Sequence, residues 1–170
     1  LATLGMFFFK GDCNWRHNLP CKPEISPAIS LFFLIGVFGG LYAFARKGFS
    51  AWRETFLIGW FGIFLLPEVL TAEGIPHALR AIGVIIPAYL FAAIGLYTAW
   101  KWLEQKQKPR WKWLATAFVI LLLLASSERV FREYFFVWAD SPETAKEFTR
   151  QYSHIAAYLI SLPPETPKYI

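Results

Sequence analysis

The stretch ISPAISLFFLIGVFGGLYAFA, residues 25–45, contains no charged side chain. An α-helix rises about 1.5 Å per residue, so about 20 such residues cross the roughly 30 Å of hydrocarbon in a bilayer. Three later segments have the same character, although Pro67 and Glu68 interrupt the first of them near its end. They run from Thr55 to about Ala72, from Ala81 to Trp100 and from Trp113 to about Ser127. The sequence therefore predicts an all-α membrane protein with four transmembrane helices.

The composition of the whole chain agrees with this prediction. Of the 170 residues, 56% are hydrophobic and only 17% are charged, and the charges crowd into short connectors between apolar runs. The net charge of +5 would suggest nucleic acid as a partner of a soluble protein. Here the basic residues flank the spans, so the bilayer is the predicted partner and nucleic acid is not.

The basic residues also predict the orientation. The connectors 46–54 and 101–112 together hold 8 of the 17 Lys and Arg residues but only 2 of the 12 Asp and Glu residues. Positively charged connectors stay in the cytoplasm. We therefore expect a membrane protein whose N-terminus and C-terminus both lie on the non-cytoplasmic side.

This topology divides the chain into three parts. Residues 1–24 form an outward loop that follows an upstream helix, residues 25–127 form the four-helix region, and residues 128–170 form an outward tail. The chain is expected to be a fragment, because both ends read as cut from a longer protein. Residues 168–170 would begin a strand of a truncated soluble domain.

The outward tail is predicted to contain an amphipathic helix. Ser141-Pro142-Glu143 combines an N-cap, a proline at the first helical position and an acid in the first turn. One apolar stripe follows at helical spacing, made of Ala145, Phe148, Tyr152, Ile155, Leu159 and Leu162. The polar face is mixed in sign, which favours packing against protein over lying on the membrane surface.

The first outward loop concentrates polar residues beside a span. Asp12, Arg16, His17 and Asn18 lie within one short stretch, and an Arg fork with His and Asn donors suits a phosphate headgroup. The alternative is a loop whose polar residues bond only one another. A disulfide between Cys13 and Cys21 and two free cysteines are both open, since the outer face is oxidising. The cysteine spacing fits no zinc motif, so no metal site is predicted.

The loop between the second and third spans is the other candidate. A helix that starts at Pro76 would place His77 and Arg80 on one face, because they are three residues apart. Arg80 at the membrane edge suits a phosphate or pyrophosphate. The alternative is an interfacial arginine that is paired with Glu68 or Glu73.

Motifs along nearly the whole chain resemble bacterial polytopic glycosyltransferases. The residues that carry the resemblance are Leu4-Gly5-Met6-Phe7, Gly11-Asp12, Asn14-Trp15-Arg16-His17-Asn18, Leu66-Pro67-Glu68, PHALRAIG at 76–83, Pro87, Tyr134-Phe135, Trp138, Pro142 and 159–163. They resemble the C-terminal membrane portion of the family 39-like enzymes of the GT-C superfamily, relatives of protein mannosyltransferases and aminoarabinose transferases. PHALRAIG is the most specific of these motifs. The Cys13/Cys21 pair is not part of the family pattern.

The resemblance implies a transferase that takes a sugar from a polyprenyl-phosphate donor at the outer face of the membrane. The family's catalytic carboxylate lies in an early outward loop, so it is expected in the N-terminal part of the same polypeptide and not in this chain. The substrate-binding and lipid-phosphate-binding candidates are Arg16, His17, Asn18, His77 and Arg80, with Asp12 and Glu73 in support. No cofactor or divalent metal is expected beside the lipid-linked sugar.

A non-catalytic membrane scaffold or assembly subunit is the alternative function. Both outward loops would then be docking surfaces. A transporter or channel is disfavoured, because the spans carry almost no charge near mid-membrane.

Overall fold

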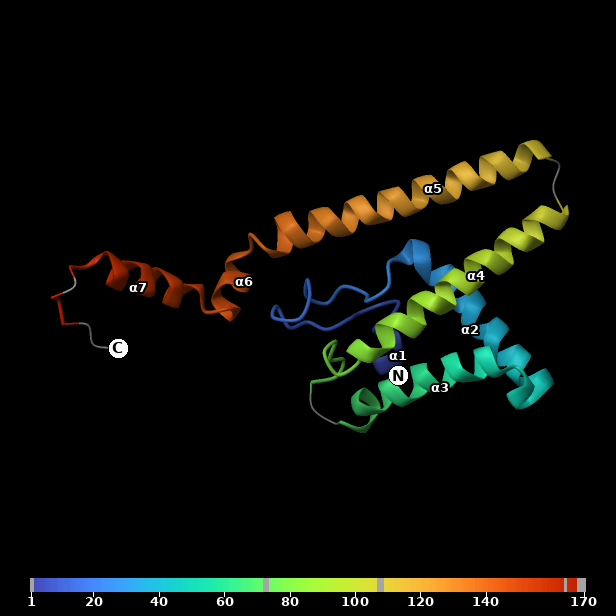
Figure 1. The fold of residues 1–170 in the computed structure, drawn as a ribbon, viewed down its shortest axis with the longest axis horizontal. Coiled ribbons are helices and arrows are strands. Elements are labelled where there is room, and N and C mark those ends of the chain that lie inside the picture. Colours follow the sequence, from blue (N-terminus) through green and yellow to red (C-terminus); the bar gives the residue numbers. More distant parts are fainter. Residues whose placement is uncertain (1, 72–73, 107–108, 164, 168–170) are drawn as a thin grey trace.

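The computed structural model describes residues 2–71, 74–106, 109–163 and 165–167. Within these ranges the chain is helical and contains no strand, which confirms the predicted all-α class. Figure 1 shows α2, α3 and α4 lying together, α5 lying apart from them, and the tail with α6 and α7 extending away from the rest.

Three of the four segments that the sequence places in the membrane form long helices that also qualify as spans by length and composition. They are α2 (Pro27–Lys47), α4 (Ile85–Lys106) and α5 (Pro109–Arg132). In the described part of the chain, the three stretches long and apolar enough to cross a bilayer are Pro27–Ser50, Ile82–Gln105 and Lys112–Trp138. These helices are compatible with a membrane protein.

Helix α3 (Trp52–Leu70) occupies the place of the second predicted span. Its 19 residues include Arg53 and Glu54 in the first turn and Glu68 in the last. Because these charges dilute its apolar character, it is not one of the three stretches that qualify by composition. Three spans are thus supported by length and composition, and the fourth stays a prediction.

Helices α2 and α4 pack against each other at the level of their backbones. A Cβ atom added to Gly36 would overlap the carbonyl of Phe91, and one added to Gly95 would overlap the carbonyl of Phe32. Glycine therefore sets the closeness of this crossing, as it does in many membrane helix pairs. The side chain of Phe91 is buried at the crossing.

The core continues from this crossing into the N-terminal segment. The Phe7 ring lies 6.0 Å from that of Phe33 on α2 and 5.6 Å from that of Phe61 on α3. Met6 beside it is 1% exposed. Residues before the first loop are thus anchored among three helices, and that loop begins from a fixed point.

Helix α5 lies apart from this core. None of the residues in its apolar stretch is buried. It also runs beyond its predicted end at Ser127, through Arg132 and a π-helical turn over Glu133–Trp138. The earlier end was wrong because the charges that suggested it are paired: Arg129 bonds Glu133 at 2.8 Å, one helical turn away.

The tail forms two helices where one continuous amphipathic helix was expected. Helix α6 (Pro142–Glu147) starts as predicted, with the Ser141 hydroxyl accepting the N–H of Glu143 at 3.2 Å. Helix α7 (Arg150–Ser161) follows only after Thr149, whose φ of 52° interrupts the helical path. The break lies beside the contact of Phe148 with the Trp138 ring at 5.9 Å. The predicted strand at 168–170 lies outside the described residues.

Candidate functional site

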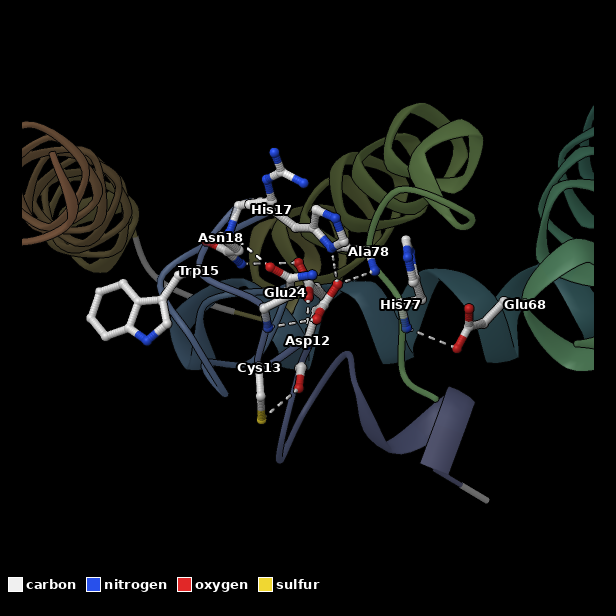
Figure 2. A network of polar contacts seen from close by, with 12 residues as sticks. Asp12, Cys13, Trp15, His17, Asn18, Glu24, Glu68, His77 and Ala78 are labelled. Atoms are coloured by element: carbon white, nitrogen blue, oxygen red, sulfur yellow. Dashed lines mark hydrogen bonds and ion pairs between the residues drawn. The ribbon is translucent and has the colours of Figure 1, made fainter. Parts of the chain in front are cut away.

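Asp12 connects the two outward loops. Its Oδ1 accepts the N–H of Asn14 at 2.8 Å, and its Oδ2 accepts the N–H of Ala78, 66 residues along the chain, also at 2.8 Å. The same Oδ2 lies 2.6 Å from Nδ1 of His17. Figure 2 shows Asp12 between the first loop and the segment that carries His77 and Ala78. One buried carboxylate thus holds together the two loops that the sequence singled out separately.

The first loop is tied back on itself around Asp12. Cys13 and Cys21 form a disulfide, one of the two alternatives that the sequence left open. The N–H of Cys21 donates to the carbonyl of Asp12 at 2.7 Å. A Cβ on Gly11 would overlap the carbonyl of Lys22, so the loop closes this tightly only with glycine there.

The second loop is held by a buried acid. Glu68 in the last turn of α3 is 0% exposed, and its Oε1 accepts the N–H of His77 at 3.0 Å. This contact brings the His77 ring to 4.5 Å from the His17 ring, measured between centroids. Two imidazoles from different loops therefore face the same small space beside Asp12.

The two acids of the first loop have opposite pKa shifts. Burial alone would raise the pKa of the Asp12 carboxyl, but hydrogen bonds from His17 and from the backbone of Ala78 and Asn14 together hold this pKa below its ordinary value. Burial raises the pKa of Glu24, although it accepts hydrogen bonds from the backbone N–H of Asp12 and from Asn18. Asp12 is therefore an ionised anchor and not a proton acceptor awaiting a substrate.

Of the predicted site residues, the structure brings Asp12, His17 and His77 together. Arg80 is close by in sequence, and its N–H donates to the carbonyl of His77 at 3.2 Å. Its side chain is half-buried at this end of the molecule. Oε1 of Glu68, one of the two predicted partners of Arg80, bonds His77, and Oε2 has no hydrogen-bond partner in the described part of the chain.

The other predicted residues lie differently. Arg16 is exposed, and its Nε donates to the carbonyl of Glu147 in α6 at 3.1 Å, so it contacts the tail rather than the histidines. Asn18 donates to Oε2 of Glu24 at 3.2 Å. The Asn18 contact is of the kind expected if loop residues bond one another, whereas the Arg16 contact leaves the loop for the tail. Glu73 lies outside the described residues.

Sequence reasoning gave no site role to Glu24 and considered Glu68 only as a partner of Arg80. Both acids border an apolar helix, and an acid in that position needs a partner. That signal was available for both residues. Each acid accepts a backbone N–H, from Asp12 to Glu24 and from His77 to Glu68, and no side-chain motif reveals such partners.

An apolar cavity of about 150 Å³ opens beside this cluster. His17 and Glu24 form its polar end, and its other walls are mainly apolar. A larger groove of about 670 Å³ shares Glu24 and Tyr89 with it and reaches α5, with Lys22 and Arg129 among its lining residues. The site therefore combines a polar end, formed by the Asp12, His17 and His77 cluster, with an adjoining apolar cavity.

The sequence predicts no metal site. In the structure, potential ligand atoms of Asp12, His17 and His77 nevertheless all lie within 4.8 Å of one another.

Comparison with protein-family models, with curated proteins and with solved structures finds no match to this chain. The chemistry of the site must therefore be argued from its own residues.

Proposed function

We propose that this chain is the later membrane portion of a polytopic glycosyltransferase, similar to the family 39-like GT-C enzymes, that uses a sugar carried on polyprenyl phosphate. The single observation that carries the proposal is the hydrogen bond from Ala78 to Asp12, which joins the two phosphate-binding candidate loops. Residues that the resemblance names from distant parts of the chain are thereby gathered at one end of the helices.

In the proposed topology α3 also crosses the membrane, as the second of four spans in chain order. Its charges lie at its two ends, and Glu68 is buried and bonded to the chain. Figure 1 supports an arrangement with two distinct faces: the α2–α3 junction lies at one end of the helices together with the C-terminal end of α4, and the two loops lie at the other. The basic connectors would then be cytoplasmic, and both termini would be outside a bacterial inner membrane.

The lipid phosphate would bind at the polar end of this site, beside the Asp12, His17 and His77 cluster. Arg80, His17 and His77 supply donors from two loops, and a guanidinium with imidazoles suits a phosphate ester. The first isoprene units would enter the apolar cavity beside His17, whose walls include Ile82, Ile85 and Tyr89. In a bilayer the isoprenoid chain is already in hydrocarbon, so the cavity would position the chain while the polar groups supply most of the affinity.

The chain's own residues bind and orient in this proposal. Asp12 holds His17 and the Ala78 segment in place, and it is too fully bonded to act as a base. The catalytic carboxylate is expected in the N-terminal part of the same polypeptide. The residues here fix the donor so that its sugar faces that carboxylate.

Binding of undecaprenyl phosphate to the purified chain in nanodiscs tests the proposal. Arg80→Gln should weaken binding at least about tenfold, or about 1.4 kcal/mol. Arg53→Gln is the matched control, because Arg53 lies at the other end of α3 from Glu68. Undecaprenol without phosphate should bind both variants like the wild type. Binding of the phosphate to Arg80→Gln within about twofold of wild type would remove Arg80 from the site.

A further inference from the structure

The cluster of Asp12, His17 and His77 has the donor set of a metal site. It offers one carboxylate and two imidazoles, with potential ligand atoms all within 4.8 Å of one another. The side chains of Asp12 and His17 are 6% and 9% exposed, so the space between them is shielded from bulk water. A carboxylate with two histidines and one open position is a recurrent arrangement for Zn²⁺.

The surroundings of the carboxylate are those of a supported ligand. The N–H groups of Asn14 and Ala78 each donate to one Asp12 oxygen at 2.8 Å and fix its orientation. Such outer hydrogen bonds are what hold the ligands of known metal sites in place. Asp12 therefore does not need a metal in order to be ordered.

His77 supplies the independent observation. Its Nδ1 is buried and has no hydrogen-bond partner in the described part of the chain. A buried imidazole nitrogen without a partner is costly, because it has lost its water without a replacement. Zn²⁺ between the two rings would supply the missing partner.

We propose that Asp12, His17 and His77 bind one Zn²⁺ and that this ion joins the two outward loops. In the structure Nδ1 of His17 and Oδ2 of Asp12 share a hydrogen bond of 2.6 Å. Zn²⁺ would replace that proton, and the two atoms would separate to about 3.3 Å, the edge of a tetrahedron with bonds of about 2.0–2.1 Å. The ligand atoms of the three residues now lie within 4.8 Å of one another, so bringing His77 to the same spacing requires the two loops to approach by up to about 1.5 Å.

The chemistry of the donors and of the compartment selects the metal. Two imidazoles disfavour Mg²⁺ and Ca²⁺, which prefer oxygen ligands. Fe²⁺ accepts the same donor set, but the neighbouring Cys13–Cys21 disulfide belongs to an oxidising environment. Zn²⁺ has no redox chemistry and keeps its charge there.

The proposal does not depend on the glycosyltransferase assignment. It concerns metal content, which is measured on the chain without any lipid or sugar. If the assignment also holds, the ion would add positive charge beside the proposed site of the lipid phosphate. Loss of zinc binding and loss of lipid binding are then separate outcomes.

The experiment measures Zn²⁺ bound to the full chain in nanodiscs after equilibration with a zinc-buffered solution. The wild type should hold about one ion per chain, and His17→Ala and His77→Ala should each weaken binding at least about tenfold. His154→Ala is the matched control, since His154 is exposed on α7 and should leave binding unchanged. Circular dichroism checks that each variant remains helical.

Co²⁺ gives a second readout that a merely structural role would not produce. The wild type and His154→Ala should show the intense visible absorption of tetrahedral Co²⁺, and His77→Gln should lose it. His77→Gln retains the backbone N–H that bonds Glu68, which guards against misfolding. A wild-type chain that binds no Zn²⁺ at micromolar concentration, or variants that bind it as the wild type does, would overturn the proposal.

Discussion

The α2–α4 pair and helix α5 are both apolar enough to cross a membrane, yet they relate to the rest of the molecule in opposite ways. Helices α2 and α4 approach until a single methyl group at Gly36 or Gly95 would collide with the facing backbone. Helix α5 buries none of its apolar stretch. Hydrophobicity thus predicts which segments enter lipid, whereas the placement of small residues predicts which of them pack together.

The two regions are joined by polar contacts at the end that carries the loops. Lys22 in the first loop pairs with Glu133 after α5, and Nε1 of Trp138 donates to the carbonyl of Trp15 at 2.8 Å. The Nε of Arg16 reaches the carbonyl of Glu147. The packed region is therefore held by its interior, whereas α5 is held by a few polar contacts near its ends, which include Lys112 with Glu104 of α4 at 3.9 Å.

The largest effect is expected where the backbones touch. Gly36→Ala should destabilise the chain by about 1–3 kcal/mol, because its Cβ would overlap the carbonyl of Phe91 and force the helices apart. Gly39→Ala on the same helix meets no atom within 4 Å, and it should be neutral or stabilising by up to about 1 kcal/mol. Unfolding in mixed detergent compares the two. Equal stabilities would show that α2 and α4 do not meet at Gly36.

Removing the charge of Asp12 should cost somewhat less. Asp12→Asn keeps the shape but weakens three hydrogen bonds, so we expect a loss of about 1–3 kcal/mol and faster exchange of the Ala78 amide hydrogen. Asp140→Asn is the control, because Asp140 is exposed.

The difference between wild type and Asp12→Asn should depend on pH. The pKa of Asp12 is lowered in the folded chain, so its contribution is complete above its unfolded value of about 4 and is lost as the pH falls through the folded value. Thermal unfolding from pH 7 to pH 3 should show the two proteins converging at the acid end. A gap that widens on acidification would contradict the ionised anchor.

A smaller effect is expected where the helix that continues α5 contacts the first loop. Trp138→Phe removes only the hydrogen bond to Trp15, worth about 0.5–1.5 kcal/mol. The helices of the packed region should be unaffected, and cross-linking between α5 and the first loop should become less efficient. Trp113→Phe, at a 78% exposed position near the other end of α5, is the control. Unchanged cross-linking would show that this hydrogen bond does not hold α5.

The smallest effect is expected along α5 itself. Leu121→Ala should change the stability by less than about 0.5 kcal/mol, because Leu121 is 64% exposed and meets the same apolar surroundings before and after unfolding in a bilayer. Leu57→Ala on α3, where the leucine is buried, is the contrasting variant and should cost clearly more than Leu121→Ala. Similar losses from both variants would mean that α5 packs on a surface it does not touch here.

The sequence was sufficient for features that depend on local chemistry. The apolar runs predicted α2 and α4 to within a few residues at most ends, and Ser141-Pro142-Glu143 predicted the start of α6. It failed where distant residues decide. The helix continues beyond Ser127 to Glu133, which pairs with Lys22 of the first loop as well as with Arg129, and the break at Thr149 divides the predicted apolar stripe.

The candidate site shows the same division. Residue types and spacing indicated His17 and His77 as separate candidates in two loops. Their meeting at Asp12 depends on the N–H of Ala78 and on the buried Glu68, and a backbone partner 66 residues away leaves no trace in a local pattern. The same limit explains why the sequence did not predict a metal site. Asp12 and His17 are five residues apart, but His77 follows His17 only after sixty residues.

We propose that the two loops bind one lipid phosphate, and a double-variant cycle tests this shared site most directly. Undecaprenyl phosphate binding is measured for wild type, His17→Ala, Arg80→Gln and the double variant. Residues that share one ligand are not additive, so each single change should weaken binding about tenfold and the double variant little more than the stronger single one. Losses that multiply to about a hundredfold, or singles that bind like the wild type, would contradict a shared site.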